Sequence, residues 1–216
     1  MQWLGMDLQI SGKRALVSAG HKGLGRAIAT RLLEEGAAVA ICCRRQDELD
    51  EAVEALGALG AVDGRICDFS DPDAVQAWVA AAGEALGGID ICIGNASASG
   101  QRGEGPQPWQ NSFAVDILGT AMFYEAAKPF LVESNAAAIV QIATITAIEH
   151  HDVPISPSYG ASKAATINLI AQLAQRWGPE GIRANTVSPG PILIENGRWD
   201  DSRERLPELY ERDRLM

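Results

Sequence analysis

The sequence predicts an α/β fold in which helices cover both faces of one doubly wound parallel sheet. Short apolar runs alternate along the chain with helix-like segments of about 10 to 20 residues, and such helices provide the crossovers that parallel strands need. A glycine-rich turn joins the first strand to the first helix, as in folds that bind ligands at the carboxyl ends of the strands. No linker or repeat interrupts the 216 residues, so one three-layer domain over residues 1–216 is expected, with a charged tail from about residue 198.

Strands are expected where apolar residues follow one another without a helical period. In chain order they cover residues 15–17, 39–43, 62–67, 90–94, 137–143 and 183–187. Each run is short, which is typical of a buried strand in a parallel sheet.

Helices are expected where apolar residues recur three and four positions apart. In chain order they cover residues 24–35, 47–59, 71–86, 109–131 and 158–177. The third has the clearest start, because Asp71 can cap it and Pro72 suits its first position. In the fourth, Pro129 is expected to disturb the helix, since proline lacks the backbone N–H.

The turn after the first strand contains Gly20, Gly23 and Gly25. The helix that follows has unpaired amides and a positive dipole at its N-terminus, which together favour an anion such as a phosphate. The spacing is G-x-x-G-x-G, whereas the dinucleotide fingerprint is G-x-G-x-x-G. On this stretch alone, the alternative is a turn that needs glycine only to bend.

The bulk composition excludes several classes of function. A formal net charge of −10 argues against sequence-independent nucleic-acid binding and gives no reason to expect an anionic membrane surface as a partner. No apolar run approaches the ~18 residues of a membrane span, and no secretory signal precedes the first strand. The four cysteines lie in or beside apolar runs without metal-ligand spacing, which favours reduced thiols in a cytoplasmic protein.

Basic side chains follow the second strand. Arg44 and Arg45 lie where a carboxylate would bind the ribose 2′-hydroxyl of NAD, whereas an arginine accommodates the 2′-phosphate of NADP. Lys22, inside the glycine turn, adds a further cation on the same side. The cofactor is therefore expected to be NADP(H) rather than NAD(H), the alternative being a pair of surface arginines at the start of a helix.

A tyrosine and a lysine open the helix after the fifth strand. Tyr159 and Lys163 are four residues apart and share one helix face. A tyrosine with its ordinary pKa near 10 is a poor acid or base at pH 7, and a neighbouring ammonium lowers that pKa by stabilising the phenolate. Two hydroxyls, Thr144 and Thr146, end the preceding strand and are placed to hydrogen-bond a carbonyl oxygen beside the tyrosine.

Five motifs come in one order: SAGHKGLG at 18–25, CDF at 67–69, GNAS at 94–97, YGASK at 159–163 and NTVSPGPI at 185–192. Together they resemble the short-chain dehydrogenase/reductase family, in its single-domain NADP(H)-preferring branch, from about residue 10 to residue 192. The resemblance implies a Rossmann fold and hydride transfer between nicotinamide and a carbonyl or alcohol carbon. It also implies a homo-oligomer of two or four copies.

The resemblance assigns roles to individual residues. It implies that Tyr159 is the general acid/base, that Lys163 lowers the tyrosine pKa and holds the nicotinamide ribose, and that Thr144 orients the substrate. Asp68 and Phe69 would contact the adenine, and residues 189–192 would border the carboxamide. The cofactor-binding set is Ser18, Gly20, His21, Lys22, Gly23, Leu24, Gly25, Arg44, Arg45, Asp68, Phe69, Asn95, Ala96, Tyr159, Lys163, Pro189, Gly190 and Ile192.

The sequence departs from the family pattern in the site. Asp116 replaces an asparagine that anchors a water in the proton relay to the lysine, and a carboxylate there would pair with Lys163. Its effect on turnover is left open. Thr144 lies two residues further from the tyrosine than usual, and Thr146 has the usual spacing, so the strand motif IVQIAT decides for Thr144. Ala19 replaces the family's first loop glycine.

Further departures concern the loops and the end of the chain. Ser97 replaces a glycine, and Ile194 replaces a threonine that often holds the carboxamide. Family chains continue with another helix and a seventh strand, so either this sequence is a fragment or its sheet lacks that edge strand. The pair His150 and His151 is expected in a solvated pocket loop rather than a metal site, and the charged tail is expected to be a solvated helix or a lid.

Two functions from different classes fit these residues. The first is an NADP(H)-dependent oxidoreductase acting on a small carbonyl or alcohol substrate. The second is an NADPH-binding regulator or scaffold with weak or no catalysis, which Asp116, the altered GNAS segment and the early end of the chain suggest. The enzyme is favoured, because a pure binder has no evident use for Tyr159 together with Lys163.

Overall fold

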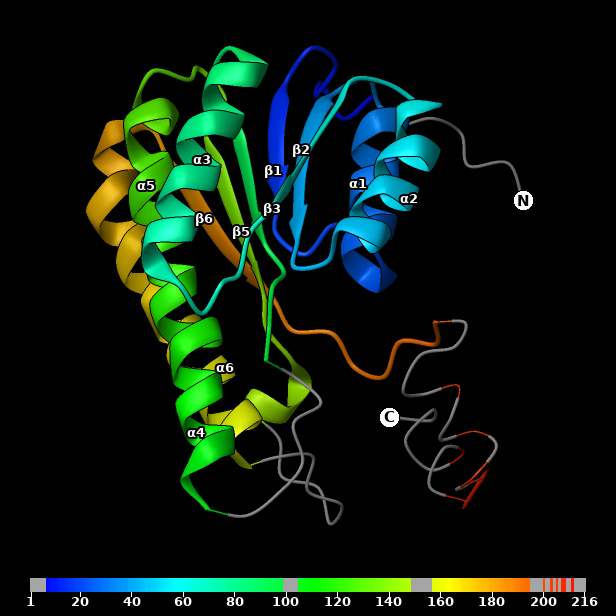
Figure 1. Ribbon diagram of the computed structural model, residues 1–216. Coiled ribbons are helices and arrows are strands. Elements are labelled where there is room, and N and C mark those ends of the chain that lie inside the picture. Colours follow the sequence, from blue (N-terminus) through cyan, green and yellow to red (C-terminus); the bar gives the residue numbers. More distant parts are fainter. Residues whose placement is uncertain are drawn as a thin grey trace.

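The computed structural model describes residues 7–98, 105–148 and 157–194, together with residues 200, 203, 205, 207, 208 and 211. One six-stranded sheet lies between two layers of helices (Figure 1). Every strand pair is parallel, and the order β3-β2-β1-β4-β5-β6 is that of a doubly wound sheet. The predicted fold class is confirmed.

The elements alternate as the sequence predicts. The strands are β1 (Arg14–Val17), β2 (Ala38–Cys43), β3 (Val62–Ile66), β4 (Ile91–Gly94), β5 (Ala138–Ile142) and β6 (Arg183–Val187). The α-helices are α1 (Gly23–Glu34), α2 (Gln46–Gly57), α3 (Pro72–Leu86), α4 (Pro106–Ser112), α5 (Thr120–Val132) and α6 (Pro157–Trp177). Short helical turns follow at η2 (Ile145–Ala147) and η3 (Gly178–Glu180).

The strand order places the site. Leu16 in the middle of β1 pairs with Ala40 of β2 on one side and with Cys92 of β4 on the other. The chain thus winds outward from β1 in both directions, and in sheets of this kind the ligand crevice is expected beyond the carboxyl ends of the strands where the order reverses, here β1 and β4. The glycine turn after β1 and the turn η2 after β5 lie at this same end of the sheet (Figure 1).

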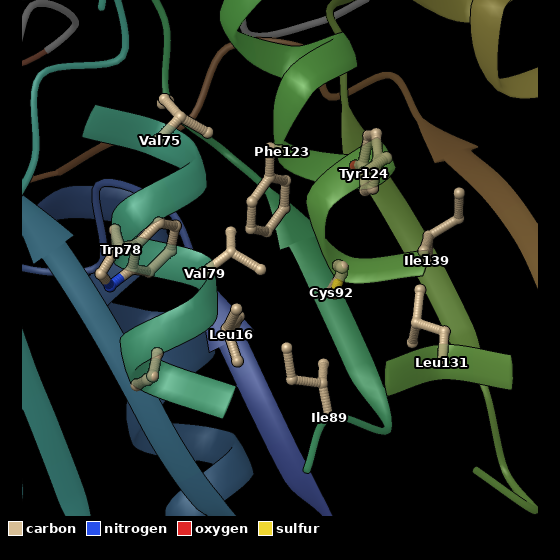
Figure 2. Packing of buried hydrophobic residues seen from close by; sticks show 14 of the residues in the cluster. Leu16, Val75, Trp78, Val79, Ile89, Cys92, Phe123, Tyr124, Leu131 and Ile139 are labelled. Atoms are coloured by element: carbon tan, nitrogen blue, oxygen red, sulfur yellow. The ribbon is translucent and has the colours of Figure 1, made fainter. Parts of the chain in front are cut away.

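Separate apolar clusters hold the helices to the two faces of the sheet. One face packs against α1 and α2, through residues such as Leu33 and Leu56. The other packs against α3, α5 and α6, and its centre is aromatic: the rings of Trp78 and Phe123 stack with centroids 5.5 Å apart (Figure 2). Such a ring pair contributes about 0.5–1.5 kcal/mol beyond its area burial.

The helix predicted over 109–131 differs from the expectation in two ways. It begins at Pro106, and the turn Phe113–Gly119 (η1) is a π-helix between α4 and α5. Pro129 lies inside α5 without ending it, because Glu125, whose carbonyl loses its partner, is exposed to water. Gly119 closes η1 against the loop after β3, since a Cβ there would lie 2.1 Å from the backbone oxygen of Phe69.

The cysteines and the charged tail agree with the sequence predictions where the structure describes them. The four cysteines are free and buried. Among the described helices, none combines the length and apolarity needed to cross a membrane. The predicted loop with His150 and His151 lies outside the described residues, and in the charged tail the described residues are helical, with Arg203 ion-paired to Asp200 at 2.7 Å.

Candidate active site

The glycine turn is fastened to the neighbouring strand by two polar side chains. The hydroxyl of Ser18, fully buried at the end of β1, accepts from the backbone N–H groups of Asn95 and Ala96, at 2.8 and 2.9 Å. The side-chain amide of Asn95 in turn donates to the backbone oxygens of Ser18 and Ala19, at 3.0 and 3.3 Å. The segments after β1 and β4 are thereby locked together at the crevice.

Close approach makes glycine necessary in this turn. A Cβ on Gly20 would lie 2.6 Å from a methyl of Ile41, and one on Gly25 would lie 2.4 Å from the backbone oxygen of Ala19. Gly23 has a φ of +57° and a far more open surrounding, the nearest atom to its Cβ position being Ile194 Cδ1 at 3.4 Å. Ala19 itself has a φ of +51°, a left-handed conformation that costs a non-glycine residue about 1–2 kcal/mol.

The start of α1 has the character of an anion site. Its N-cap, Lys22, makes no side-chain capping bond, and the first turn contains no acidic residue. The first amides of a helix have no partner within the helix, so here they are left for a ligand. A diphosphate fits this cradle, because Gly23 leaves space beside those amides.

Substitution of Gly25 provides a test of this packing. We expect Gly25→Ala to lower the free energy of unfolding by about 1–3 kcal/mol, the usual cost of overpacking, because the new methyl meets a backbone oxygen that cannot move freely. Gly57→Ala, at the exposed end of α2 where a Cβ meets nothing within 4 Å, is the matched control. In the control, the free energy of unfolding measured in urea should rise by about 0.5–1 kcal/mol. Equal changes in both variants would contradict the close packing of the turn.

Lys163 is buried in the first half of α6 and paired with Asp116. Its ammonium lies 3.2 Å from Asp116 Oδ1 and donates to the backbone oxygen of Ile142 at 3.1 Å. Both side chains are almost fully buried, at 2% and 0% exposure. The pairing that the sequence predicted is therefore confirmed, with α6 supplying the lysine and the π-helix η1 supplying the carboxylate.

The contact is an ion pair rather than an aligned hydrogen bond. Oδ1 of Asp116 is close to the ammonium but has no hydrogen-bond partner, whereas Oδ2 accepts from the backbone N–H of Ala98 at 3.2 Å. Burial lowers the pKa of Lys163, and the charge of Asp116 offsets part of that fall. A lysine with a lowered pKa exchanges its proton nearer neutral pH, which suits a proton relay.

Tyr159 lies one helical turn before Lys163, at the start of α6 and partly exposed. The next residue, Gly160, allows the turn η2 to approach, since a Cβ there would lie 3.0 Å from the backbone oxygen of Thr146. The hydroxyl of Thr144, the N-cap of η2, lies 3.3 Å from that of Thr146. The two threonines thus form one hydroxyl pair beside the helix start, and the choice of Thr144 stays a prediction.

Contacts between backbone and side chains join the two halves of the site. Lys163 is ion-paired with Asp116, which accepts a hydrogen bond from the backbone N–H of Ala98. Three residues before Ala98, the side chain of Asn95 donates to the glycine turn. On the other side, the backbone N–H of Ile145 donates to the oxygen of Pro189 at 3.0 Å, which ties the segment after β6 to η2. The segment continues to Ile194, beside Gly23.

Some residues that are predicted to contact the cofactor have side chains that contact other protein groups. The ring of Phe69 is buried against Trp78 and Phe123, and the carboxylate of Asp68 accepts from the backbone N–H and hydroxyl of Ser70. Ala96 is buried. Gly190 and Ile192 lie in the segment after β6, exposed and half-buried respectively.

Two basic residues of the glycine turn meet a carboxylate that the sequence did not indicate. Glu48, near the start of α2, lies 3.1 Å from His21 Nε2 and 3.2 Å from Lys22 Nζ. Arg44 is exposed and has no ion-pair partner within the described parts of the chain. No local pattern marks Glu48, because the residues it contacts in the glycine turn lie 26 positions or more before it.

Comparison with known proteins gives a consistent result. The family model described as short chain dehydrogenase matches residues 13–204. Isoepoxydon dehydrogenase of Aspergillus clavatus is 34% identical over 210 residues, covering 95% of this chain and 80% of the relative. D-threitol dehydrogenase of Mycolicibacterium smegmatis is 33% identical over 207 residues, covering 91% and 77%.

Solved structures agree on the fold. The crystal structure of L-sorbose reductase from Gluconobacter frateurii, complexed with NADPH and L-sorbose, superposes with a TM-score of 0.85. The two sequences are 27% identical, and the match covers 94% of this chain and 78% of that one.

Proposed function

The chain belongs to the short-chain dehydrogenase family, and we propose that its site transfers hydride between NADP(H) and a small carbonyl or secondary alcohol. The observation that carries this proposal is the buried Lys163, one turn beyond Tyr159. Asp116 links it to the segment after β4, which fastens the glycine turn. The dehydrogenase names of the relatives favour an enzyme over an NADPH-binding regulator or scaffold.

The residues act as follows in this proposal. A bound nicotinamide supplies or accepts the hydride. Tyr159 donates a proton to the carbonyl oxygen as charge develops there, or removes it from the alcohol in the reverse direction. The ammonium of Lys163 stabilises the phenolate, and the Thr144 hydroxyl orients the substrate oxygen. The free amides at the uncapped start of α1 would hold the cofactor diphosphate.

We assign the cofactor preference to the cations after β2 and in the glycine turn. Cys43, not an acidic residue, ends β2, where a carboxylate would bind the 2′-hydroxyl of NAD, and Arg44 follows directly. An arginine binds a phosphate through charge-assisted hydrogen bonds that a hydroxyl does not replace. Binding of NADP(H) over NAD(H) is the expected result.

Substitution of Arg44 tests this assignment. We expect Arg44→Ala to weaken NADPH binding by about 10- to 100-fold, the value of a charge-assisted hydrogen bond, and to change NADH binding by less than about twofold. Arg31→Ala, on α1 and paired there with Glu34 and Glu35, is the control and should change neither. Titration of the nicotinamide fluorescence measures both affinities. Equal losses for the two cofactors would remove Arg44 from the 2′-phosphate site.

The reaction itself is tested by following NADPH oxidation with a panel of small aldehydes and ketones. An enzyme consumes NADPH with at least one of them. Tight NADPH binding without oxidation across the panel, with turnover restored by Asp116→Asn, would favour the regulator or scaffold instead. A homo-oligomer stays a prediction, which light scattering of the purified protein checks.

A further inference from the structure

We propose that Glu48 competes with the cofactor 2′-phosphate for the cations around the glycine turn and so limits the preference for NADPH over NADH. This inference rests on the proposed function, because it concerns the same cofactor site. It assigns a specificity-determining role to a residue of α2 that no motif marks.

The contacts of Glu48 connect two segments of the chain. Its carboxylate accepts hydrogen bonds from Lys22 Nζ at 3.2 and 3.4 Å and lies 3.1 Å from His21 Nε2, both residues of the glycine turn. It also lies 3.7 Å from Arg45 Nη1, at the end of the β2–α2 loop. One carboxylate thus engages three basic side chains around the place where the ribose of the cofactor is expected.

The imidazole of His21 shows how closely Glu48 is integrated into the turn. Its side chain is only 10% exposed, and its Nδ1 has no hydrogen-bond partner, so the contact with Glu48 is what orients the ring. Burial lowers the pKa of His21, and the nearby Lys22 lowers it further, against the opposing effect of Glu48. A neutral ring donates one N–H to Glu48, which leaves most of the carboxylate charge to Lys22, because the guanidinium of Arg45 is hydrogen-bonded to Asp47.

Glu48 is ionised and remains accessible to a ligand. Burial raises its pKa, but Lys22 and His21 lower it more, so the net change is a fall from the ordinary value. Its side chain remains 28% exposed, and Lys22 is 68% exposed. The pair therefore lies at the surface of the crevice, where an incoming phosphate meets it.

The competition follows from charge. A phosphate monoester carries about −1.5 to −2 charges at neutral pH, so it is repelled by Glu48 and gains Lys22 only by displacing that carboxylate. An uncharged 2′-hydroxyl, as in NADH, meets neither cost. Arg44, with no ion-pair partner in the described residues, is the one basic side chain of this group that a 2′-phosphate engages without displacing a carboxylate. Glu48 therefore lowers the affinity for NADPH and leaves that for NADH nearly unchanged.

The test compares Glu48→Gln with Glu51→Gln. Glutamine keeps the length of the side chain and removes the charge. Glu51 lies on the same helix with 82% exposure, its carboxylate 4.0 Å from Arg26, so its substitution changes the net charge equally away from the cations of the site. Affinities for NADPH and NADH are measured by nicotinamide fluorescence on the same sample. Their ratio does not depend on the folded fraction.

We expect Glu48→Gln to bind NADPH about tenfold more tightly, the value of one or two partly exposed ion pairs, and NADH within about twofold of the parent chain. Glu51→Gln should change the ratio by less than about twofold, since exposed charges at a distance are screened by salt. A weaker or unchanged NADPH affinity in Glu48→Gln would overturn the inference, because Glu48 would then position the cations instead of withholding them. Failure of the parent chain to bind either cofactor would overturn the proposed function itself.

Discussion

Replacing Tyr159 by phenylalanine should lower turnover about 10²- to 10⁴-fold, the contribution of one positioned proton donor, while NADPH binds within about twofold of the parent affinity. The phenyl ring keeps the shape of the helix start, so the loss falls on the chemical step. Turnover is followed as NADPH oxidation with the best substrate of the carbonyl panel, and affinity by fluorescence titration.

A second tyrosine provides the matched control. Tyr124 is fully buried, and its hydroxyl lies 3.0 Å from Gln141 Oε1 and 3.1 Å from the backbone oxygen of Val140, two acceptors that share its one proton. Like Tyr159→Phe, Tyr124→Phe removes a tyrosine hydroxyl, but it does so outside the site. It should lower the free energy of unfolding by about 1 kcal/mol and retain turnover. Turnover of Tyr159→Phe within tenfold of the parent would exclude Tyr159 as the acid/base.

The largest effect on stability is expected at Asp116. Asp116→Ala leaves the ammonium of Lys163 buried without its carboxylate, and removal of one partner from a buried pair costs about 3–5 kcal/mol. Asp116→Asn should cost less, because the amide oxygen still accepts from Ala98 or from the ammonium. Urea unfolding at pH 7 measures both.

The pH dependence of that loss has a definite sign. Burial already lowers the pKa of Lys163 in the folded chain, and removal of Asp116 takes away the charge that opposes this fall. A base whose folded pKa is lowered destabilises the fold most at pH values below that pKa, where it must be buried charged. The stability difference between the parent and Asp116→Ala should therefore shrink as pH rises from 7 toward the unfolded lysine pKa of about 10.4.

A double variant separates charge from packing. If the unpaired ammonium causes the loss, Asp116→Ala combined with Lys163→Met should be more stable than Asp116→Ala alone, because the buried charge is then absent. A double variant that is less stable by the sum of the two single losses would show that Asp116 acts through packing or the Ala98 contact instead.

Most of the fold could be predicted because its signals are local. The apolar strand runs and the helical spacing of residues such as Leu49, Ala52 and Leu56 are properties of neighbouring positions, and the observed element order follows them. The fourth predicted helix was the exception. Its π-helical turn depends on contact with the loop after β3, at Gly119 and Phe69, and Pro129 is tolerated because its face of α5 is exposed.

The site divides in the same way. The sequence by itself determined the glycine turn, the one-turn spacing of Tyr159 and Lys163, and the cations after the second strand, since each is a motif of a few consecutive residues. Only the tertiary structure decided that Asp116 is fully buried against Lys163, and that Glu48 engages His21 and Lys22. These pairs join residues from distant elements, which the folded sheet brings within about 3 Å of one another. The charges interact most strongly between Asp116 and Lys163, because water is excluded from that pair, whereas Lys22 beside Glu48 remains 68% exposed.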